Sequence, residues 1–239
     1  MSTYNYLGLV NDVNRRLNEV ELTENTFEGA IGYYASVKDA VNASIRYINQ
    51  SQFEWPFNHA EAEDTLNEGQ VRYAFPTDMK TADMDSFRIK RSQEYNNETR
   101  KLRILSYEEY LDKYVDDEYN EDNESIRTLP QYVFRAPDLS FGVVPPPDNP
   151  YELVYEYYRL PVDLEKPRDV PTIPEQFRHV IVEGAMYYTY QFRGDLETSG
   201  LALQKFNAGI EDMRTIYINR YDYVRSTVIE RRRTGLKVR

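Results

Sequence analysis

The sequence of 239 residues contains no cysteine. Disulfide bonds, a thiol nucleophile and thiolate metal ligands are therefore excluded. The absence of cysteine fits a reducing compartment. Only two histidines are present, His59 and His179, and they are far apart in the sequence. Two histidines cannot form a zinc site with three histidine ligands, and the motif H-E-x-x-H is also missing.

Long apolar runs are missing as well. No stretch of about 18 apolar residues occurs, so we expect no transmembrane helix and no membrane partner. The first residues, Met1 to Tyr4, have neither a basic flank nor an apolar core, so a signal peptide is not expected. The mean hydropathy is strongly negative. The chain is nevertheless long enough to bury a core, in one large domain or two small ones.

The sequence lacks the motifs of common enzymes. It has no P-loop and no G-x-G-x-x-G. Ser199 stands beside Gly200 but lacks the G-x-S-x-G of a nucleophile elbow, and a capping or turn role explains it better. His179 lies near the start of a predicted helix, where packing or solvent contact explains it better than catalysis.

The acidic run that begins at Asp116 fails the test for a calcium loop. Glu121 stands where the loop needs glycine, and Arg127 stands where it needs a bidentate glutamate. Pairs of carboxylates are uninformative in a chain with 40 acidic residues. We therefore predict a protein that is not an enzyme, with no cofactor and no metal site.

Charge is distributed unevenly along the chain. The net charge is −11, yet residues 225–239 hold six basic residues and one acidic residue. Residues 106–124 hold nine acidic residues and one lysine. An acidic body with a basic tail indicates a tail that binds a partner, and it argues against a broad nucleic-acid surface.

Tyrosine is unusually frequent, with 22 tyrosines against 10 phenylalanines and 1 tryptophan. Tyrosine combines a large contact area with a polar tip, which suits surfaces that bind other proteins. Half-buried strands in a polar protein would explain the same composition equally well.

The strongest structural signal is a predicted αα-hairpin over residues 174–219. Pro174 suits a first helical turn, Gly194 suits a left-handed helix end, and Asp195 or Thr198 can cap the second helix. Apolar residues recur at helical spacing on both sides of the break. The first stripe is Phe177, Val180, Ile181, Tyr188 and Phe192, and the second is Leu203, Phe206, Ile210, Met213 and Tyr217.

Two more helices are expected at the N-terminus. The first covers about 5–20, with a stripe of Leu9, Val10, Val13, Leu17 and Val20. The second covers about 27–50, with Asn25 or Thr26 as its cap and a stripe of Ile31, Tyr34, Val37, Val41, Ile45 and Ile48. Gly29 and Gly32 would weaken its first turns or mark close packing against another helix.

The middle of the chain alternates like β-strands. Strands are predicted at 70–75, 86–91, 101–105, 132–136, 139–144 and 151–159, and the last has the clearest alternation. Ser106 and Glu109 form a capping box for a short helix, and the acidic residues after it are expected to form a mobile loop.

Helices at both ends and strands between them predict an α+β fold. We expect a helical body from 1–55 and 172–222, which would form a ring, and a strand-rich insertion, 56–171, like a small β-barrel or sandwich. An acidic helix and loop occupy 106–128 of this insertion. Residues 223–239 form a basic arm.

The order of these segments resembles the head-to-tail adaptor proteins of tailed bacteriophages, also called neck or tail-tubular A proteins. The helix "LVNDVNRRLNEVEL" and a longer helix precede the strand "GQVRYAFPTDM". The segments "VVPPPDNPYELVYEYYRLPVDL" and "IPEQFRHVIVEGAMYYTYQFRGD" follow, and then a long helix. The resemblance covers nearly the whole chain, and the order of the motifs carries it more than any single motif.

The resemblance implies a structural virion protein without catalytic activity. Copies of the chain would form a dodecameric ring in the neck, between the portal protein and the tail tube or nozzle protein, and tail fibres could dock on it. Double-stranded DNA would pass through the ring without specific binding. The protein would be made in the host cytoplasm.

The basic tail has three interpretations. It could be a frayed terminus, which is usual at chain ends. It could be an arm that orders on the portal, pairing its arginines with acidic residues. It could also hold DNA phosphates, although fixed cations would slow DNA that has to slide. We favour the arm, whose candidate residues are Arg225, Val228, Ile229, Arg231, Arg232, Arg233, Leu236, Lys237 and Arg239.

Two further surfaces have open interpretations. Glu183, Glu197, Glu211 and Asp212 lie on predicted helix faces and would repel DNA from a channel wall, or else form an ordinary solvated face. The acidic segment carries Tyr107, Tyr110, Tyr114 and Tyr119, which could contact the tail, a fibre or a neighbouring copy, or belong to a plain loop.

Two alternative functions follow from the same residues. The chain could be a tail-associated binding module, with a fibre dock or with tyrosine-rich strands that recognise a glycan. A cell-wall hydrolase is a third hypothesis, which no motif supports.

Overall fold

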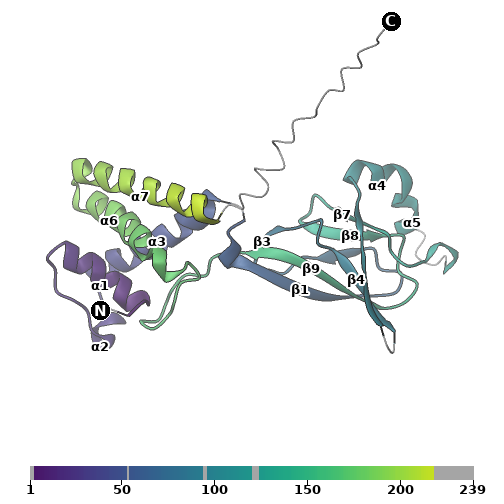
Figure 1. Ribbon diagram of the computed structural model, residues 1–239, viewed down its shortest axis with the longest axis horizontal. Helices are drawn as coiled ribbons and strands as arrows, with labels where there is room; N and C mark the ends of the chain where they lie inside the picture. Colours follow the sequence, from purple (N-terminus) through teal and green to yellow (C-terminus); the bar gives the residue numbers. More distant parts are fainter. Residues whose placement is uncertain (1–2, 53, 94–95, 120–123, 218–239) are drawn as a thin grey trace, which may run out of the picture. The chain divides into compact units, whose positions relative to one another are not determined.

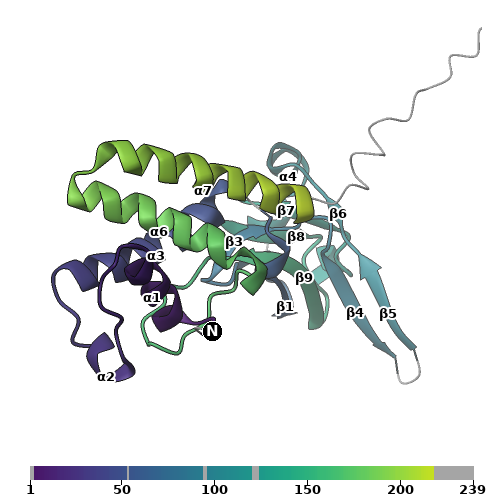
Figure 2. The same ribbon diagram turned by 60° about the vertical axis from the view of Figure 1, so that its left-hand side comes forward.

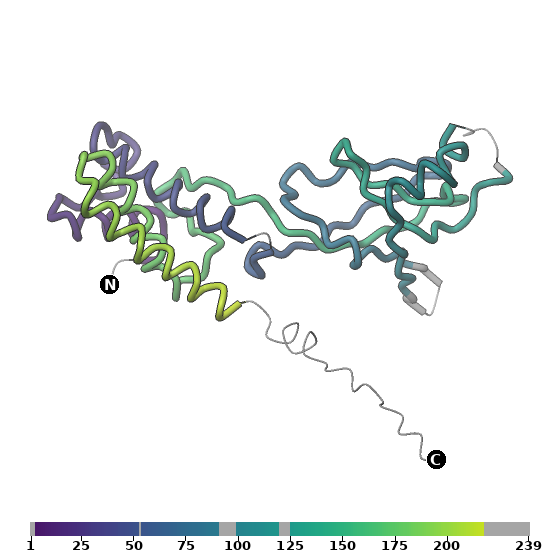
Figure 3. Tube along the Cα trace, turned by 90° about the horizontal axis from the view of Figure 1, so that it is seen from above, coloured from purple at the N-terminus to yellow at the C-terminus, as the bar shows by residue number. Residues whose placement is uncertain are grey.

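The structure is a computed structural model that describes residues 3–52, 54–93, 96–119 and 124–217. The chain divides into two compact units. The helical unit contains residues 1–44, 166–168 and 175–239, and the strand unit contains residues 45–165 and 169–174. Figure 3 follows the chain through this order. The first boundary falls inside a helix.

The helical unit is built from both ends of the chain. It contains α1 (Tyr6–Arg16), α2 (Glu24–Phe27), the first part of α3 (Tyr33–Ser51), α6 (Arg178–Arg193) and α7 (Leu196–Tyr217). α6 and α7 lie side by side as a hairpin (Figures 1 and 2). A 3₁₀ turn, Glu175–Phe177, follows Pro174 and leads into α6. The predicted αα-hairpin is therefore confirmed.

The predicted helix at 27–50 begins too early. Thr23 and Thr26 form the capping box of α2, and Gly32 has a left-handed φ of +59° just before α3. A left-handed residue interrupts a right-handed helix, so the apolar pattern could not continue through it. A Cβ added to Gly29 or Gly32 would meet nothing within 4 Å, so neither glycine marks a close contact.

Most residues of the predicted apolar stripes are buried, but three at their ends are not. The exposed fractions are 74% for Val20, 82% for Ile31 and 62% for Phe192. Val20 lies after the end of α1 at Arg16, and Ile31 lies in the break before α3. Helical periodicity therefore continues in the sequence past the end of α1 and before the start of α3, whereas Phe192 is exposed inside α6, next to its last residue.

The strand unit contains two sheets. The first has the order β1 (His59–Leu66), β9 (Tyr151–Arg159), β4 (Arg88–Gln93) and β5 (Asn96–Lys101), and β3 (Met79–Ala82) also pairs with β9. The second has the order β2 (Arg72–Ala74), β8 (Ser140–Val144), β7 (Tyr132–Arg135) and β6 (Arg103–Ile104). Within the described residues these strands form no closed barrel, and the α+β class is confirmed.

One core joins the two sheets. Leu66, Ile89, Leu153 and Tyr155 of the first sheet pack with Phe141 of the second. The Phe87 and Tyr155 rings stack with their centroids 4.4 Å apart. This arrangement is typical of a sandwich, in which alternate residues of each strand point toward the other sheet.

A short helical segment covers the second sheet. α4 (Tyr107–Lys113) is followed by α5 (Val115–Tyr119) and a 3₁₀ turn at Glu124–Ile126. Figure 1 shows α4 and α5 beside β7 and β8. Residues 115–119 are thus helical, and the expectation of a mobile loop there is wrong. Residues 120–123 lie outside the described part of the chain.

Candidate assembly surfaces

The α6–α7 hairpin is held together at a glycine. A Cβ added to Gly184 would lie 2.2 Å from the Ser44 Oγ and 2.6 Å from the Phe206 ring. Across the same interface, a Cβ on Gly209 would lie 2.8 Å from Val180. Only glycine permits these approaches. Gly184 therefore marks a close helix contact, and this contact lies within one subunit.

The break between the two helices also follows the sequence. Gly194 adopts a left-handed conformation with a φ of 78°. The Thr198 N–H donates to the Asp195 Oδ1 at 3.1 Å, as an N-cap does. Hydrogen bonding from Thr198 lowers the pKa of Asp195. This turn fixes the direction in which α7 leaves the hairpin.

The four candidate channel acids have different surroundings. The Glu183 carboxylate accepts from Arg16 on α1 at 2.5 Å, and its side chain is only 21% exposed. Glu197, Glu211 and Asp212 are exposed on α7, and Glu211 pairs with Arg214. Glu183 therefore holds α1 against α6, whereas the three acids on α7 face outward from the helical unit.

The same part of α7 also exposes apolar side chains. The exposed fractions are 73% for Leu196, 59% for Leu201 and 62% for Ile216. Together with the acidic residues they give α7 a mixed surface that no described element of the helical unit covers. Exposed apolar side chains bordered by charged ones resemble the apolar core and polar rim of a protein interface.

The acidic segment begins with the predicted cap. The Glu109 N–H donates to the Ser106 Oγ at 3.2 Å. Tyr110 is fully buried, and its ring stacks on Phe134 with the centroids 3.9 Å apart. The Tyr110 hydroxyl donates to the Glu118 carboxylate, which fastens α5 beside α4. Tyr110 is therefore a core residue, with no free face for a partner.

The other three tyrosines of this segment differ in exposure. Tyr107 and Tyr114 are half-buried and pack against the cluster that contains Tyr110. Tyr119 is 82% exposed, and Leu111 on the same segment is 42% exposed. Of the predicted tyrosine contacts, Tyr119 is the side chain with most of its surface available.

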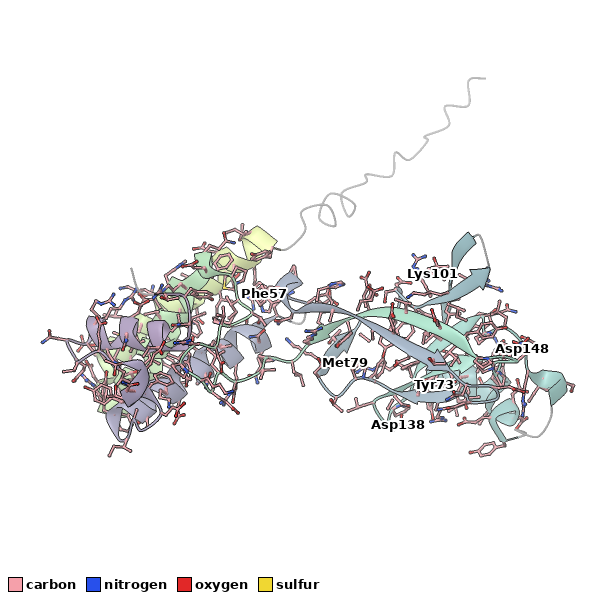
Figure 4. All side chains as sticks on the ribbon, turned by 90° about the horizontal axis from the view of Figure 1, so that it is seen from below. Phe57, Tyr73, Met79, Lys101, Asp138 and Asp148 are labelled. Atoms are coloured by element: carbon pink, nitrogen blue, oxygen red, sulfur yellow. The ribbon has the colours of Figure 1, made fainter. Side chains whose placement is uncertain are left out.

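Several tyrosines of the strand unit are buried or half-buried and have a bonded hydroxyl. The Tyr155 hydroxyl donates to the Asp64 Oδ2 at 2.8 Å, and burial together with this carboxylate raises the pKa of Tyr155. The Tyr151 hydroxyl donates to the Asp148 Oδ1 at 2.7 Å. Figure 4 labels Tyr73 and Asp148 in this unit. The half-buried-strand interpretation of the tyrosine content is right for these residues.

The strand unit has a cleft of about 390 Å³ that is lined by charged pairs. The Arg72 Nε donates to the Glu118 Oε1 at 2.8 Å, and the Arg127 Nη1 donates to the Glu68 Oε1 at 2.8 Å. Because the lining charges neutralise one another, the cleft has no evident preference for a charged ligand.

His59 belongs to the strand unit, whereas His179 and Ser199 belong to the helical unit. His59 lies 3.1 Å from Glu156 on an exposed strand, and His179 is exposed on α6. Ser199 is buried in α7, where its hydroxyl donates to the Tyr187 carbonyl at 3.3 Å. Ser199 thus lies inside a helix, not at its cap. The described residues contain no cluster of histidine and acidic side chains that could hold a metal ion.

The predicted arm cannot be placed, because residues 218–239 lie outside the described part of the chain. Among the helices of the described residues, none has the length and apolar character needed to cross a membrane.

Comparison with protein families identifies the chain. A family model described as SU10 adaptor protein matches residues 4–232. The chain belongs to the SU10 adaptor protein family. The match covers both units and most of the basic tail, and no curated protein matches the chain.

Membership of the SU10 adaptor family confirms the predicted resemblance and makes this chain a structural adaptor of a bacteriophage. A phage adaptor is a component of the virion and assembles with other head or tail proteins.

Proposed function

We propose that this SU10 adaptor protein forms the ring that joins the portal protein to the tail tube or nozzle protein. Neighbouring copies would build a dodecameric ring in the neck of the virion, and DNA would pass through its channel. The observation that carries the proposal is the family match over residues 4–232. The compact helical unit, assembled from both ends of the chain, suits a ring wall.

The surface of α7 contributes a second line of support. Glu197 and Asp212 are exposed there, close to the start and the end of the helix. Carboxylates at a channel wall repel phosphate and keep passing DNA from adhering. We propose that these two residues and Glu211 face the channel, and that Glu183 serves the packing of α1 on α6.

We assign portal binding to the basic arm that follows α7. Its three consecutive arginines, Arg231 to Arg233, would pair with acidic portal residues, and Val228 and Ile229 would supply apolar contact. The remaining members of the arm surface are Arg225, Leu236, Lys237 and Arg239. We propose that the arm becomes ordered when it binds the portal protein.

The test is binding to the portal protein of the same phage, measured by co-sedimentation. Deletion of 228–239 should abolish binding and leave the circular dichroism of both units unchanged. Replacing Arg231–Arg233 with glutamate should weaken binding more than replacing them with glutamine, because opposite charge adds repulsion to the lost pairs. Normal binding by the deletion variant would refute the role of the arm.

Fibre docking is a second candidate function, supported by the exposure of Tyr119 and Leu111 beside the acidic helices. Exposed aromatic and aliphatic side chains on one segment are typical anchors of interfaces. Changing both residues to alanine should remove fibres from the particle and leave portal binding intact. Particles that keep their fibres would exclude this dock.

A further inference from the structure

The first sheet ends in two strands that have neighbours on one side only. β1 pairs with β9 over all eight of its residues, and β5 pairs with β4 over six. No other strand of the described residues pairs with the outer edge of either strand. An open edge presents a row of unpaired N–H and C=O groups that can accept a strand from another chain.

The solvent-facing side of this sheet changes charge from one edge to the other. Glu61 and Glu63 are exposed on β1, and β1 holds no lysine or arginine. On the opposite edge, β5 exposes Lys101 on this side, where it pairs with Asp85, and Figure 4 labels Lys101. Arg100 is also exposed, but it lies on the other face of β5, opposite the buried Ile89. The whole hairpin 88–101 holds five basic and two acidic residues. One edge is therefore acidic and the other basic.

The acidic edge is only partly neutralised within the sheet. Glu61 of β1 lies opposite Glu156 of β9, and like charges directly opposite each other are destabilising. His59 contacts Glu156, and Lys90 contacts Glu63. Glu61 forms no ion pair with another described residue. A basic group supplied from outside would relieve this repulsion.

The basic edge extends past the rest of the sheet. β4 pairs with β9 only through Arg88 to Lys90, while its pairing with β5 continues to Gln93 and Asn96. Figure 2 shows β4 and β5 running together beyond β9 and β1. Part of the hairpin therefore has no covering strand on either side among the described residues, which gives it reach toward another molecule.

We infer that β5 of one copy pairs with β1 of the next copy, so that the first sheet continues from subunit to subunit. β1, β9, β4 and β5 alternate in direction, and a following β1 would continue that antiparallel order. Pairing of two β1 edges would oppose acids, and pairing of two β5 edges would oppose bases. Charge therefore selects a head-to-tail contact, the kind that can close into a ring.

The inference rests on the proposed ring, and its partner is a second copy of this chain. Because the sequence has no cysteine, introduced cysteines report on the contact without background. Thr65 on β1 and Thr99 on β5 are exposed and lie in one cross-strand row through Glu152 and Lys90. Three strand spacings of about 4.8 Å separate them, too far for a disulfide within one chain.

The experiment uses phage particles assembled with the variant chain, whose necks are imaged in parallel. After oxidation, the variant T65C/T99C should give a ladder of disulfide-linked chains at multiples of 28.3 kDa on a denaturing gel run without reductant. Because the register between copies can shift along the strand, T99C is also combined with E63C and with E61C. Particles that contain either single variant alone should give no ladder, and particles that contain a mixture of the two should give dimers.

The outcomes separate the two proposals. A ring in the images with no ladder from any of the three pairs overturns the edge pairing and leaves the ring proposal standing. Dimers from T65C alone or T99C alone overturn the head-to-tail arrangement. The absence of a ring overturns the proposed function and the edge pairing together.

A charge reversal tests whether opposite charges on β1 and β5 favour the pairing of these two edges. Glu61→Lys on the edge strand should reduce ladder formation by about fivefold, the scale of an exposed charge pair. The matched control is Glu152→Lys, which makes the same change on the central strand β9 of the same face. Lys101→Glu in the same chain as Glu61→Lys should restore the ladder. An equal effect of the two lysine variants would contradict a contact at the β1 edge.

Discussion

Replacing Gly184 with alanine tests the packing of the helical unit. The new Cβ would lie 2.2 Å from the Ser44 Oγ and 2.6 Å from the Phe206 ring, closer than real Cβ atoms approach. Both neighbours are buried, with Phe206 at 0% exposure. Ser44 also donates to the Ile181 carbonyl at 2.9 Å, so moving it breaks a buried hydrogen bond. The overlap cannot be relieved by a flexible side-chain end.

The magnitude follows from two opposing effects. Alanine is favoured over glycine inside a helix by about 1 kcal/mol. Overpacking costs about 1–3 kcal/mol, and a buried group that loses its hydrogen bond costs a similar amount. Because both penalties apply at Gly184, we expect Gly184→Ala to lower the free energy of unfolding by about 2 kcal/mol.

Gly200→Ala is the matched control. Gly200 also lies inside a helix, α7, and a Cβ added there would meet nothing within 4 Å. Only the preference of a helix for alanine over glycine remains, so the free energy of unfolding of this variant should rise by up to about 1 kcal/mol. Thermal melts followed by helical circular dichroism should therefore separate the two variants by about 6–12 °C. Equal or higher stability of Gly184→Ala would refute the packing argument.

Two further predictions concern the strand unit. Tyr110→Ala removes a fully buried ring and should lower the free energy of unfolding by about 3–5 kcal/mol, seen as a lower denaturant midpoint. Tyr119→Ala, at an 82% exposed site, should change the midpoint little. Equal midpoints of the two variants would contradict the burial of Tyr110. Burial and the Asp64 carboxylate raise the pKa of Tyr155, so the folded state holds the proton more tightly than the unfolded state. The protonated Tyr155 therefore contributes its full stabilisation below the ordinary tyrosine pKa of about 10, and this stabilisation is lost as the pH rises above that value. Tyr155→Phe should weaken this loss of stability at alkaline pH. An unchanged pH dependence of the free energy of unfolding would contradict the raised pKa.

The helical hairpin could be predicted because its signals are local. Gly194 and Asp195 set the turn through their own backbone preferences, and the apolar stripes mark the packed faces. The start of α3 could not be predicted from periodicity, since Ile31 continues the stripe although Gly32 breaks the helix. A stripe fails to predict burial where the chain leaves the helix, as at Ile31, and also at the end of α6, where Phe192 is exposed.

The strands with clear alternation were predicted, and the weaker ones were missed. β9 was predicted with its observed bounds, because acidic and aromatic residues alternate over its nine residues. β1 escaped notice although Ala60, Ala62 and Leu66 point inward between acids, since alanine is a weak apolar signal. β3 and β5 are short or polar and form only because neighbouring strands pair with them.

The candidate surfaces could be predicted as segments but not as faces. Tyr110 and Tyr119 lie in the same acidic run, and nothing in the sequence distinguishes the buried ring from the exposed one. Glu183 was grouped with the acids of α7 because its partner, Arg16, is distant in the sequence. The opposite charges of β1 and β5 became meaningful only when the topology placed them at the two edges of one sheet.

The central claim is that this adaptor forms a ring between portal and tail. A cryo-electron microscopy reconstruction of the neck of the intact virion tests it most directly. The claim predicts a ring of copies of this chain around the DNA channel, with the C-terminal arm on the portal and α7 facing the DNA. A neck that lacks this chain, or a particle that carries it only in the fibres, would contradict the claim.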